Sequence, residues 1–180
     1  MTNFYENHDP ECGGSSVAHV LHLQGDAETA EQFYNGFRKH PFVLPSGEVE
    51  LKVLPKIISE LTQGKYKGIC YSNLPVSRED LERDYGQQAD EIEEVIKQMM
   101  EAGNVRPQSE SGQYAAPHVA AIYWTDDNAH AIVVTEEGHF ISDGTLYTEA
   151  TIQGFFGPDK ENGDEFEILE IAVLEIQKCP

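Results

Sequence analysis

Three cysteines lie far apart in the chain, and Cys12 is the one whose surroundings favour chemistry. It is followed by Gly13 and Gly14, and the apolar residues after them predict a largely buried helix over residues 15–24. The positive end of a helix macrodipole and its unpaired N–H groups favour the thiolate, the nucleophilic form of cysteine. The same N–H groups could stabilise an oxyanion on a bound carbonyl. The structural alternative is an inert, buried cysteine beside a glycine turn.

The other two cysteines are poorer candidates for a nucleophile. Cys70 lies in a predicted interior strand, and Cys179 is next to the last residue. Three scattered cysteines are also too few for a disulfide framework, so free thiols are expected.

A histidine and an aspartate in the second half of the chain could complete a catalytic group with Cys12. His130 opens an apolar strand, and Asp143 follows a second strand after a turn over residues 135–138. If the two strands form a hairpin, Asp143 returns to the level of His130, where its carboxylate could hold one imidazole nitrogen while the other faces the thiol. The structural alternatives are a strand-edge histidine bonded to backbone and an ordinary Asp-Gly turn at Asp143 and Gly144.

This arrangement resembles the papain-like cysteine peptidase superfamily. A Cys-Gly pair opens the first helix, and more than a hundred residues later His-Ala-Ile-Val-Val is followed by a turn and Asp-Gly. The layout is most similar to bacteriocin-processing peptidases that cleave double-glycine leaders, and to compact bacterial amidases and deamidase effectors of the same fold. Residues 46–61 also resemble the block that forms the wall behind the first helix. The resemblance spans about residues 4–157.

The resemblance implies a role for each candidate residue. Cys12 would be the nucleophile, His130 the general base and then acid, and Asp143 the residue that orients the imidazole. A glutamine amide usually precedes the cysteine as oxyanion donor; this chain has Asn7 there, which is shorter but can donate the same hydrogen bond. The implied reaction is attack on an amide or ester carbonyl through a thioester, with no metal or organic cofactor.

Other histidines raise competing interpretations. His19 and His22 lie on the same predicted helix as Cys12, at a spacing that could ligate zinc, but they fall in its apolar run and no second Cys/His pair accompanies them. Core histidines are therefore the favoured interpretation. His118 is the substitute base if His130 proves buried. Gly13 and Gly14 lack the lysine and preceding strand of a nucleotide-binding loop.

The pattern of apolar residues changes from helical to alternating along the chain. Helical spacing predicts helices over residues 15–24, 27–37 with Asp26 as N-cap, 49–61, and a long acidic helix from Ser77 to near Gly103. Strands are predicted at 68–72, 119–124, 129–135, 140–143 and 167–176. Helices followed by a mostly antiparallel sheet indicate an α+β fold.

The charge balance is strongly acidic, with 12 Lys+Arg against 32 Asp+Glu and a net charge of -20. Such a surface disfavours binding to nucleic acid or an anionic membrane, and no apolar run is long enough to span a bilayer. The first ten residues lack the features of a secretory signal, which favours a cytoplasmic location or export by a signal-independent route. The acidity also suggests a substrate or partner with a basic face.

These observations predict one papain-like domain over residues 1–180, with a helical lobe carrying Cys12 packed on an antiparallel sheet carrying His130 and Asp143. The expected function is a cysteine hydrolase of the peptidase or glutamine deamidase type, acting on a protein or peptide. The alternative is a non-catalytic acidic protein that mimics nucleic acid or binds a basic partner.

Overall fold

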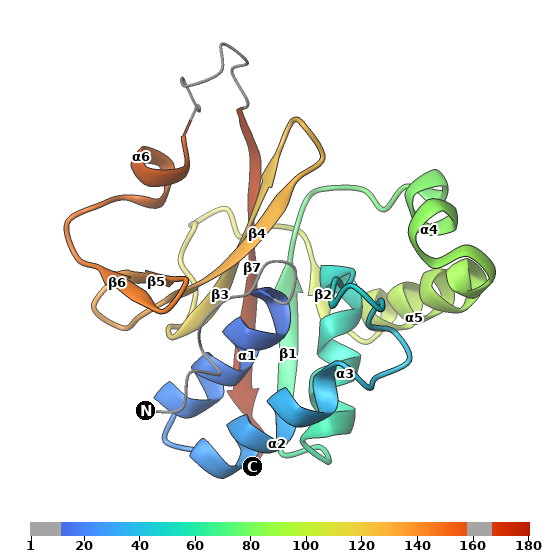
Figure 1. The fold of residues 1–180 in the computed structure, drawn as a ribbon, viewed down its shortest axis with the longest axis horizontal. Helices are drawn as coiled ribbons and strands as arrows, with labels where there is room; N and C mark the ends of the chain where they lie inside the picture. Colours follow the sequence, from blue (N-terminus) through green and yellow to red (C-terminus); the bar gives the residue numbers. More distant parts are fainter. Residues whose placement is uncertain (1–11, 158–166) are drawn as a thin grey trace.

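The computed structural model describes residues 12–157 and 167–180, which form an α+β fold around one seven-stranded sheet (Figure 1). The strand order is β2-β1-β7-β3-β4-β5-β6. The strands are β1 (Tyr66–Tyr71), β2 (Val105–Arg106), β3 (His118–Trp124), β4 (Ala129–Val134), β5 (Phe140–Ser142), β6 (Thr145–Tyr147) and β7 (Ile168–Lys178). Neighbouring strands are antiparallel apart from β1 and β2, so the predicted α+β class and mostly antiparallel sheet are confirmed.

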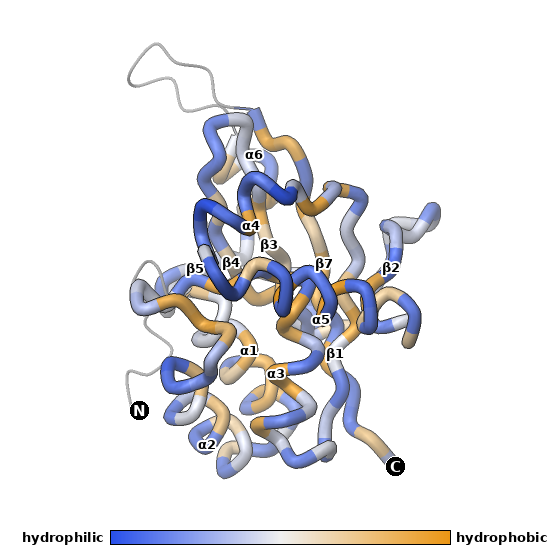
Figure 2. Tube along the Cα trace, turned by 90° about the vertical axis from the view of Figure 1, so that its right-hand side faces the viewer, coloured by the Kyte–Doolittle hydropathy of each residue, from blue (hydrophilic) through white to orange (hydrophobic). Residues whose placement is uncertain are grey.

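Helices contact the sheet mainly from the first half of the chain. They are α1 (Cys12–Leu23), α2 (Ala27–Phe37), η2 (Leu51–Val53), α3 (Leu54–Leu61), α4 (Arg78–Tyr85), η3 (Gly86–Gln88), α5 (Ala89–Glu101) and α6 (Ile152–Phe156). Helix α1 contacts β3 and β4, and α3 contacts β1. Figures 1 and 2 show α1 and α3 against the same side of the sheet, and the tube in Figure 2 is apolar where they meet it.

The period of two along β3 and β4 divides the core into two clusters. Val119, Ala121, Ala131 and Val133 belong to the larger cluster, which also contains the apolar faces of α1, α2 and α3. The alternate residues, Ala120, Ile122 and Ile132, belong with Phe140 to a smaller cluster that α6 covers with Phe156. Residues of opposite parity on one strand therefore face different surroundings.

Helix α2 has the predicted bounds and the predicted cap. Asp26 accepts a hydrogen bond from the Thr29 amide (3.2 Å), forms a 2.6 Å ion pair with Lys65, and accepts a 2.9 Å hydrogen bond from the Tyr66 hydroxyl. These contacts join the start of α2 to β1. The Lys65 ammonium is the main reason that the pKa of the Asp26 carboxyl lies well below its ordinary value.

Two predicted helices are shorter than expected. The prediction of one long acidic helix was wrong. The helical segment breaks at Gly86, whose φ of 54° turns the chain between α4 and α5. Arg78 then ties the two helices together by ion pairs to Glu82, Asp90 and Glu93. The helix predicted over 49–61 begins as the 3-10 turn η2, and α3 follows with a proline in its first turn, where the missing N–H costs little.

The predicted separation of helices and strands along the chain is incomplete. Strand β1 comes from the helical half, yet it lies between β2 and β7 in the sheet, with Cys70 opposite Leu174. The first and last parts of the chain are therefore joined through backbone hydrogen bonds of one sheet.

Candidate functional site

A large cleft of about 1230 Å³ opens beside the start of α1. Its walls come from the start of α1, the loop and 3-10 turn over residues 44–54, the loop before α4, α4 itself, and the β3–β4 hairpin. Cys12, His130 and Asp143 all line it. The structure therefore brings three of the four predicted site residues to one cavity; the fourth, Asn7, lies outside the described residues.

Cys12 is the first residue of α1 and is half-buried. The first turn of α1 contains no acidic residue of its own that would offset the helix dipole. Gly14 sets the position of this turn, because a Cβ there would lie 2.3 Å from Cδ1 of the buried Phe37 ring. The two glycines thus have different roles: Gly14 permits α1 to lie close to α2, whereas Gly13 lines the cleft.

His130 is the second residue of β4 and is half-buried. Its Nε2 forms a 3.0 Å hydrogen bond with Oγ of the buried Ser142, and its ring centroid lies 5.7 Å from that of Phe156. The register places His130 opposite Ile122, on the face of the smaller core cluster. Cys12 packs against the larger cluster, so the two residues belong to different faces of the sheet and share the cleft.

Asp143 occupies a tight turn. The predicted β4–β5 hairpin is confirmed, with Val133 opposite Ile141, but β5 ends one residue before Asp143. Asp143 (φ 50°) and Gly144 (φ 73°) are the two central residues of the β5–β6 hairpin, and both have the positive φ of a type I′ turn. The exposed Asp143 lines the cleft, and its role as the residue that orients His130 stays a prediction.

Ser142 was missed by sequence reasoning, although a signal for it existed. Residues on adjacent antiparallel strands share a face at diagonal positions, and extending the observed register places Ser142 opposite Ile132, on the face of His130. A serine one residue before the selected aspartate was therefore the better-placed partner for the ring. No local signal could have selected Phe156, which reaches the ring from a helix far along the chain.

Two further residues of the cleft, Glu50 and Tyr123, have pKa values above the ordinary ones. Burial raises the pKa of the half-buried Glu50, assisted by the charges of Asp84 and Asp80 and opposed by the Lys52 amide and ammonium. Burial also raises the pKa of Tyr123 well above its ordinary value, and the charges of Glu50 and Cys12 contribute. Tyr123 therefore keeps its hydroxyl proton at neutral pH and can act as a hydrogen-bond donor in the cleft.

Cys70, His19 and His118 lie outside the cleft lining. Cys70 is fully buried in β1, and this burial raises its pKa to about 12. Burial lowers the pKa of the half-buried His19 to about 4, and the charge of His22 contributes. The expectation that both are core histidines is wrong for His22, which is exposed at the end of α1. His118 is also buried, its Nδ1 lies 3.2 Å from the Ala115 carbonyl oxygen, and it is absent from the cleft lining. The described residues contain no group of three potential metal ligands.

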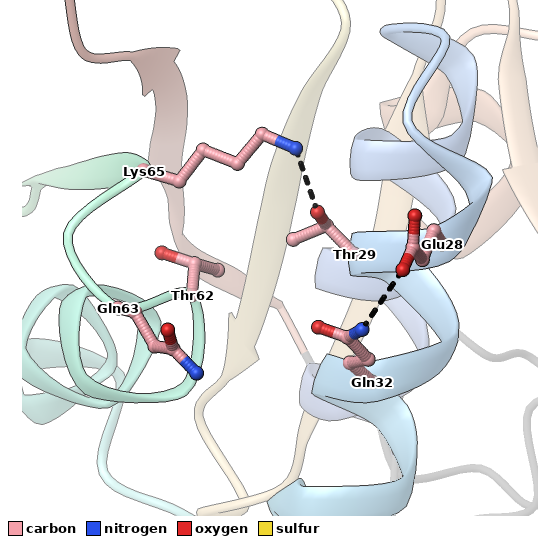
Figure 3. A pocket seen from close by; sticks show the side chains of 6 residues that line it. All are labelled: Glu28, Thr29, Gln32, Thr62, Gln63 and Lys65. Atoms are coloured by element: carbon pink, nitrogen blue, oxygen red, sulfur yellow. Dashed lines mark hydrogen bonds between the residues drawn. The ribbon is translucent and has the colours of Figure 1, made fainter.

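A second, smaller cavity of about 290 Å³ lies between α2 and the turn after α3 (Figure 3). Its side chains mostly bond one another: Lys65 Nζ donates to Thr29 Oγ1 (3.1 Å), and Gln32 Nε2 donates to Glu28 Oε1 (3.4 Å). Thr62, the remaining hydroxyl of the lining, donates to the Ile58 carbonyl (2.7 Å). This cavity offers neither a thiol nor an imidazole.

Comparisons with known proteins return no family model, no curated protein and no solved structure that matches this chain. Within the two described ranges, no helix has both the length and the apolar character needed to cross a membrane.

Proposed function

We propose that this chain is a cysteine hydrolase of papain-like architecture that attacks an amide carbonyl of a protein or peptide. The observation that carries the proposal is the shared cleft, in which a thiol at a helix N-terminus, an imidazole and a carboxylate line one large cavity. Cavities with a few convergent polar groups are the usual sites of small-molecule and peptide chemistry.

In the proposed reaction, His130 takes the proton of the Cys12 thiol and the thiolate attacks the carbonyl carbon. With the proton of the neutral ring on Nε2, donated to Ser142 Oγ, the lone pair resides on Nδ1, the nitrogen that accepts the thiol proton. The imidazolium then protonates the leaving amine as the C–N bond breaks, which leaves a thioester on Cys12. Attack by water, with His130 again as base, releases the acid and restores the thiol.

The electrostatic support for this reaction comes from α1 and Tyr123. The first turn of α1 supplies the unpaired amides of a helix N-terminus, and no acidic side chain of that turn offsets their positive potential. The protonated Tyr123 hydroxyl supplies another donor in the cleft. The Phe156 ring packs beside His130 and contributes an apolar wall to the cleft at this point.

The test is hydrolysis of a library of peptidyl aminocoumarin amides by the wild-type chain, by Cys12→Ser and by His130→Ala. We expect both variants to lose at least about 1,000-fold in kcat/KM, because removal of a nucleophile or its base removes the covalent route. The matched control is Cys70→Ser, which removes a buried thiol outside the cleft and should retain activity if it folds. Equal turnover by Cys12→Ser and the wild type would refute the proposal.

An acidic interaction protein is the second candidate, favoured by the surface of α4 and α5. Exposed carboxylates on these helices include Glu79, Glu82, Glu91, Glu93 and Glu94, and their positive charges are limited to Arg78, Arg83 and Lys97. Binding of a basic protein through this surface should weaken steeply between 50 mM and 500 mM salt. Peptide hydrolysis at Cys12 should change little over the same range.

A further inference from the structure

We propose that the cleft beside Cys12 accepts the side chain of a lysine or arginine of the substrate, with Glu50 as its counter-ion. As a statement about substrates, this inference rests on the hydrolase function proposed above. It assigns a specificity-determining role to an acidic residue that the reaction itself does not use.

The position of Glu50 relative to the nucleophile follows from its neighbour Val49. A Cβ on Gly13, the residue after Cys12, would lie 3.5 Å from Cγ1 of Val49. Glu50 and Cys12 both line the cleft, and the charges of both contribute to the raised pKa of Tyr123. A substrate whose carbonyl reaches Cys12 therefore enters the same cleft that Glu50 lines.

The Glu50 carboxylate is held in place by the start of η2. Its Oε1 accepts a hydrogen bond from the Lys52 amide (3.3 Å), and its own amide donates to the Tyr85 hydroxyl (2.8 Å). No other hydrogen bond to this carboxylate comes from the described residues, and Glu50 is half-buried in the cleft wall. One oxygen thus fixes the side chain, while the second remains available for a cation that enters the cleft.

The walls around Glu50 suit the aliphatic stem of a long basic side chain. Apolar side chains contribute a large share of the cleft lining, among them Leu44, Val49, Leu54, Leu74, Val76 and Leu81. Lysine and arginine bury their methylene groups against such surfaces while the charged end seeks a polar partner. A carboxylate within an apolar wall is a suitable partner.

The charge of the cleft favours the same occupant. Its lining contains six carboxylates, of Glu48, Glu50, Asp80, Asp84, Asp127 and Asp143, and two fixed cations, of Lys52 and Arg83. Arg83 already pairs with Asp80 (2.8 Å) and Asp84 (2.9 Å), and Lys52 Nζ donates to the Leu74 carbonyl. The excess negative charge attracts a basic segment and repels an acidic one.

The energetics of Glu50 agree with this role. Burial disfavours its ionised form and raises its pKa, with smaller contributions from Asp84 and Asp80, and the Lys52 amide and ammonium only partly oppose this effect. A bound ammonium or guanidinium would reverse this effect, so that the side chain gains more from a cation than from a neutral group. A neutral or acidic substrate residue offers no such gain.

The first experiment measures kcat/KM for tetrapeptidyl aminocoumarin amides with alanine backgrounds. One lysine is moved through the three positions nearest the scissile amide, and norleucine and glutamate replace it in matched peptides. For the wild type we expect a preference for lysine over norleucine of about tenfold or more at one position, as for a hydrogen bond between charged groups. Glu50→Gln, which keeps the oxygen that accepts the Lys52 amide, should reduce this preference to less than about threefold.

Glu91→Gln is the matched control, because it removes one negative charge from exposed α5 outside the cleft. It should keep the lysine preference. If Glu50→Gln also keeps it, or if the wild type hydrolyses all peptides without preference, the inference is overturned while the hydrolase function stands.

A binding measurement separates this inference from the function on which it rests. Fluorescence anisotropy of the labelled lysine and norleucine peptides is measured with Cys12→Ala, with and without Glu50→Gln. Tighter binding of the lysine peptide that depends on Glu50, without hydrolysis of any peptide by the wild type, would support the cation site and refute the hydrolase. Equal binding of the two peptides would overturn the cation site.

Discussion

The reactivity of Cys12 compared with that of Cys70 provides the most direct quantitative test of the proposed nucleophile. Both are thiols of the same chain, so the same sample, reagent and pH apply to each. Cys70 is fully buried with a pKa of about 12, whereas Cys12 is half-buried at the start of α1 and lines the cleft.

The expected difference follows from the thiolate fractions. Thiols at helix N-termini or beside a histidine have pKa values of ~3.5–7.5, and the upper end of this range gives about 9% thiolate at pH 6.5. A pKa of about 12 leaves about 3 × 10⁻⁶ of Cys70 as thiolate at that pH. The lower nucleophilicity of the more acidic thiol offsets about 100-fold of this ratio, so Cys12 should react at least ~300-fold faster than Cys70.

The assay is reaction with a neutral pyridyl disulfide between pH 5 and 9, quenched at intervals and read for each cysteine by peptide mass spectrometry. Glutathione in the same tubes reports the behaviour of an ordinary thiol, with a pKa near ~8.5. We expect the Cys12 rate to level off at a lower pH than the glutathione rate, and His130→Ala to move it back towards glutathione.

Two outcomes would refute the reasoning. A Cys12 rate that falls tenfold per pH unit in parallel with glutathione would mean that neither the helix nor the imidazole stabilises the thiolate. A lowered pKa that is unchanged in His130→Ala would leave the helix effect intact but would remove the imidazole from the proposed pair.

Two further predictions concern stability. Gly14→Ala should lower the free energy of unfolding in urea by at least about 1–3 kcal/mol, because its Cβ would lie 2.3 Å from the Phe37 ring. Gly13→Ala makes only ordinary contacts and should change the free energy of unfolding by less than about 1 kcal/mol. Equal effects of the two substitutions would contradict the packing role of Gly14. The Asp26 carboxyl has a lowered pKa in the fold, chiefly through Lys65, so its contribution to stability is complete above about pH 5 and is lost as the pH falls below its unfolded pKa of ~3.9. The stability difference between wild type and Asp26→Asn should accordingly shrink between pH 5 and pH 3, and a constant difference would contradict this assignment.

Local signals in the sequence determined several elements of this protein. The bounds of α2 follow from Asp26 as N-cap and the helical spacing after it, and both are found in the structure. The alternating residues of β3 and β4 predicted their strands within one residue, and the turn at Gly138 predicted the hairpin. In each case the decisive interactions join residues a few positions apart, so the local sequence is enough to specify them.

Long-range packing decided what the local pattern could not. Strand β1 has an ordinary strand sequence, but its place between β2 and β7 depends on backbone partners more than a hundred residues away for β7. The break at Gly86 lies within a continuous helical pattern, and the ion pairs of Arg78 across α4 and α5 form only after the turn. A hydrophobic period is compatible with either a straight or a broken helix.

For the candidate site, the sequence indicated the residues, and the tertiary structure decided how they are arranged. The residue types of Cys12, His130 and Asp143 and their order in the chain were enough to predict thiol chemistry, because reactive side chains are few and recognisable. Their common cleft, the hydrogen bond between Ser142 and His130 and the place of Glu50 in the wall of that cleft depend on elements far apart in sequence. Such neighbours are set by how helices and strands pack against each other, and that packing is a property of the whole core.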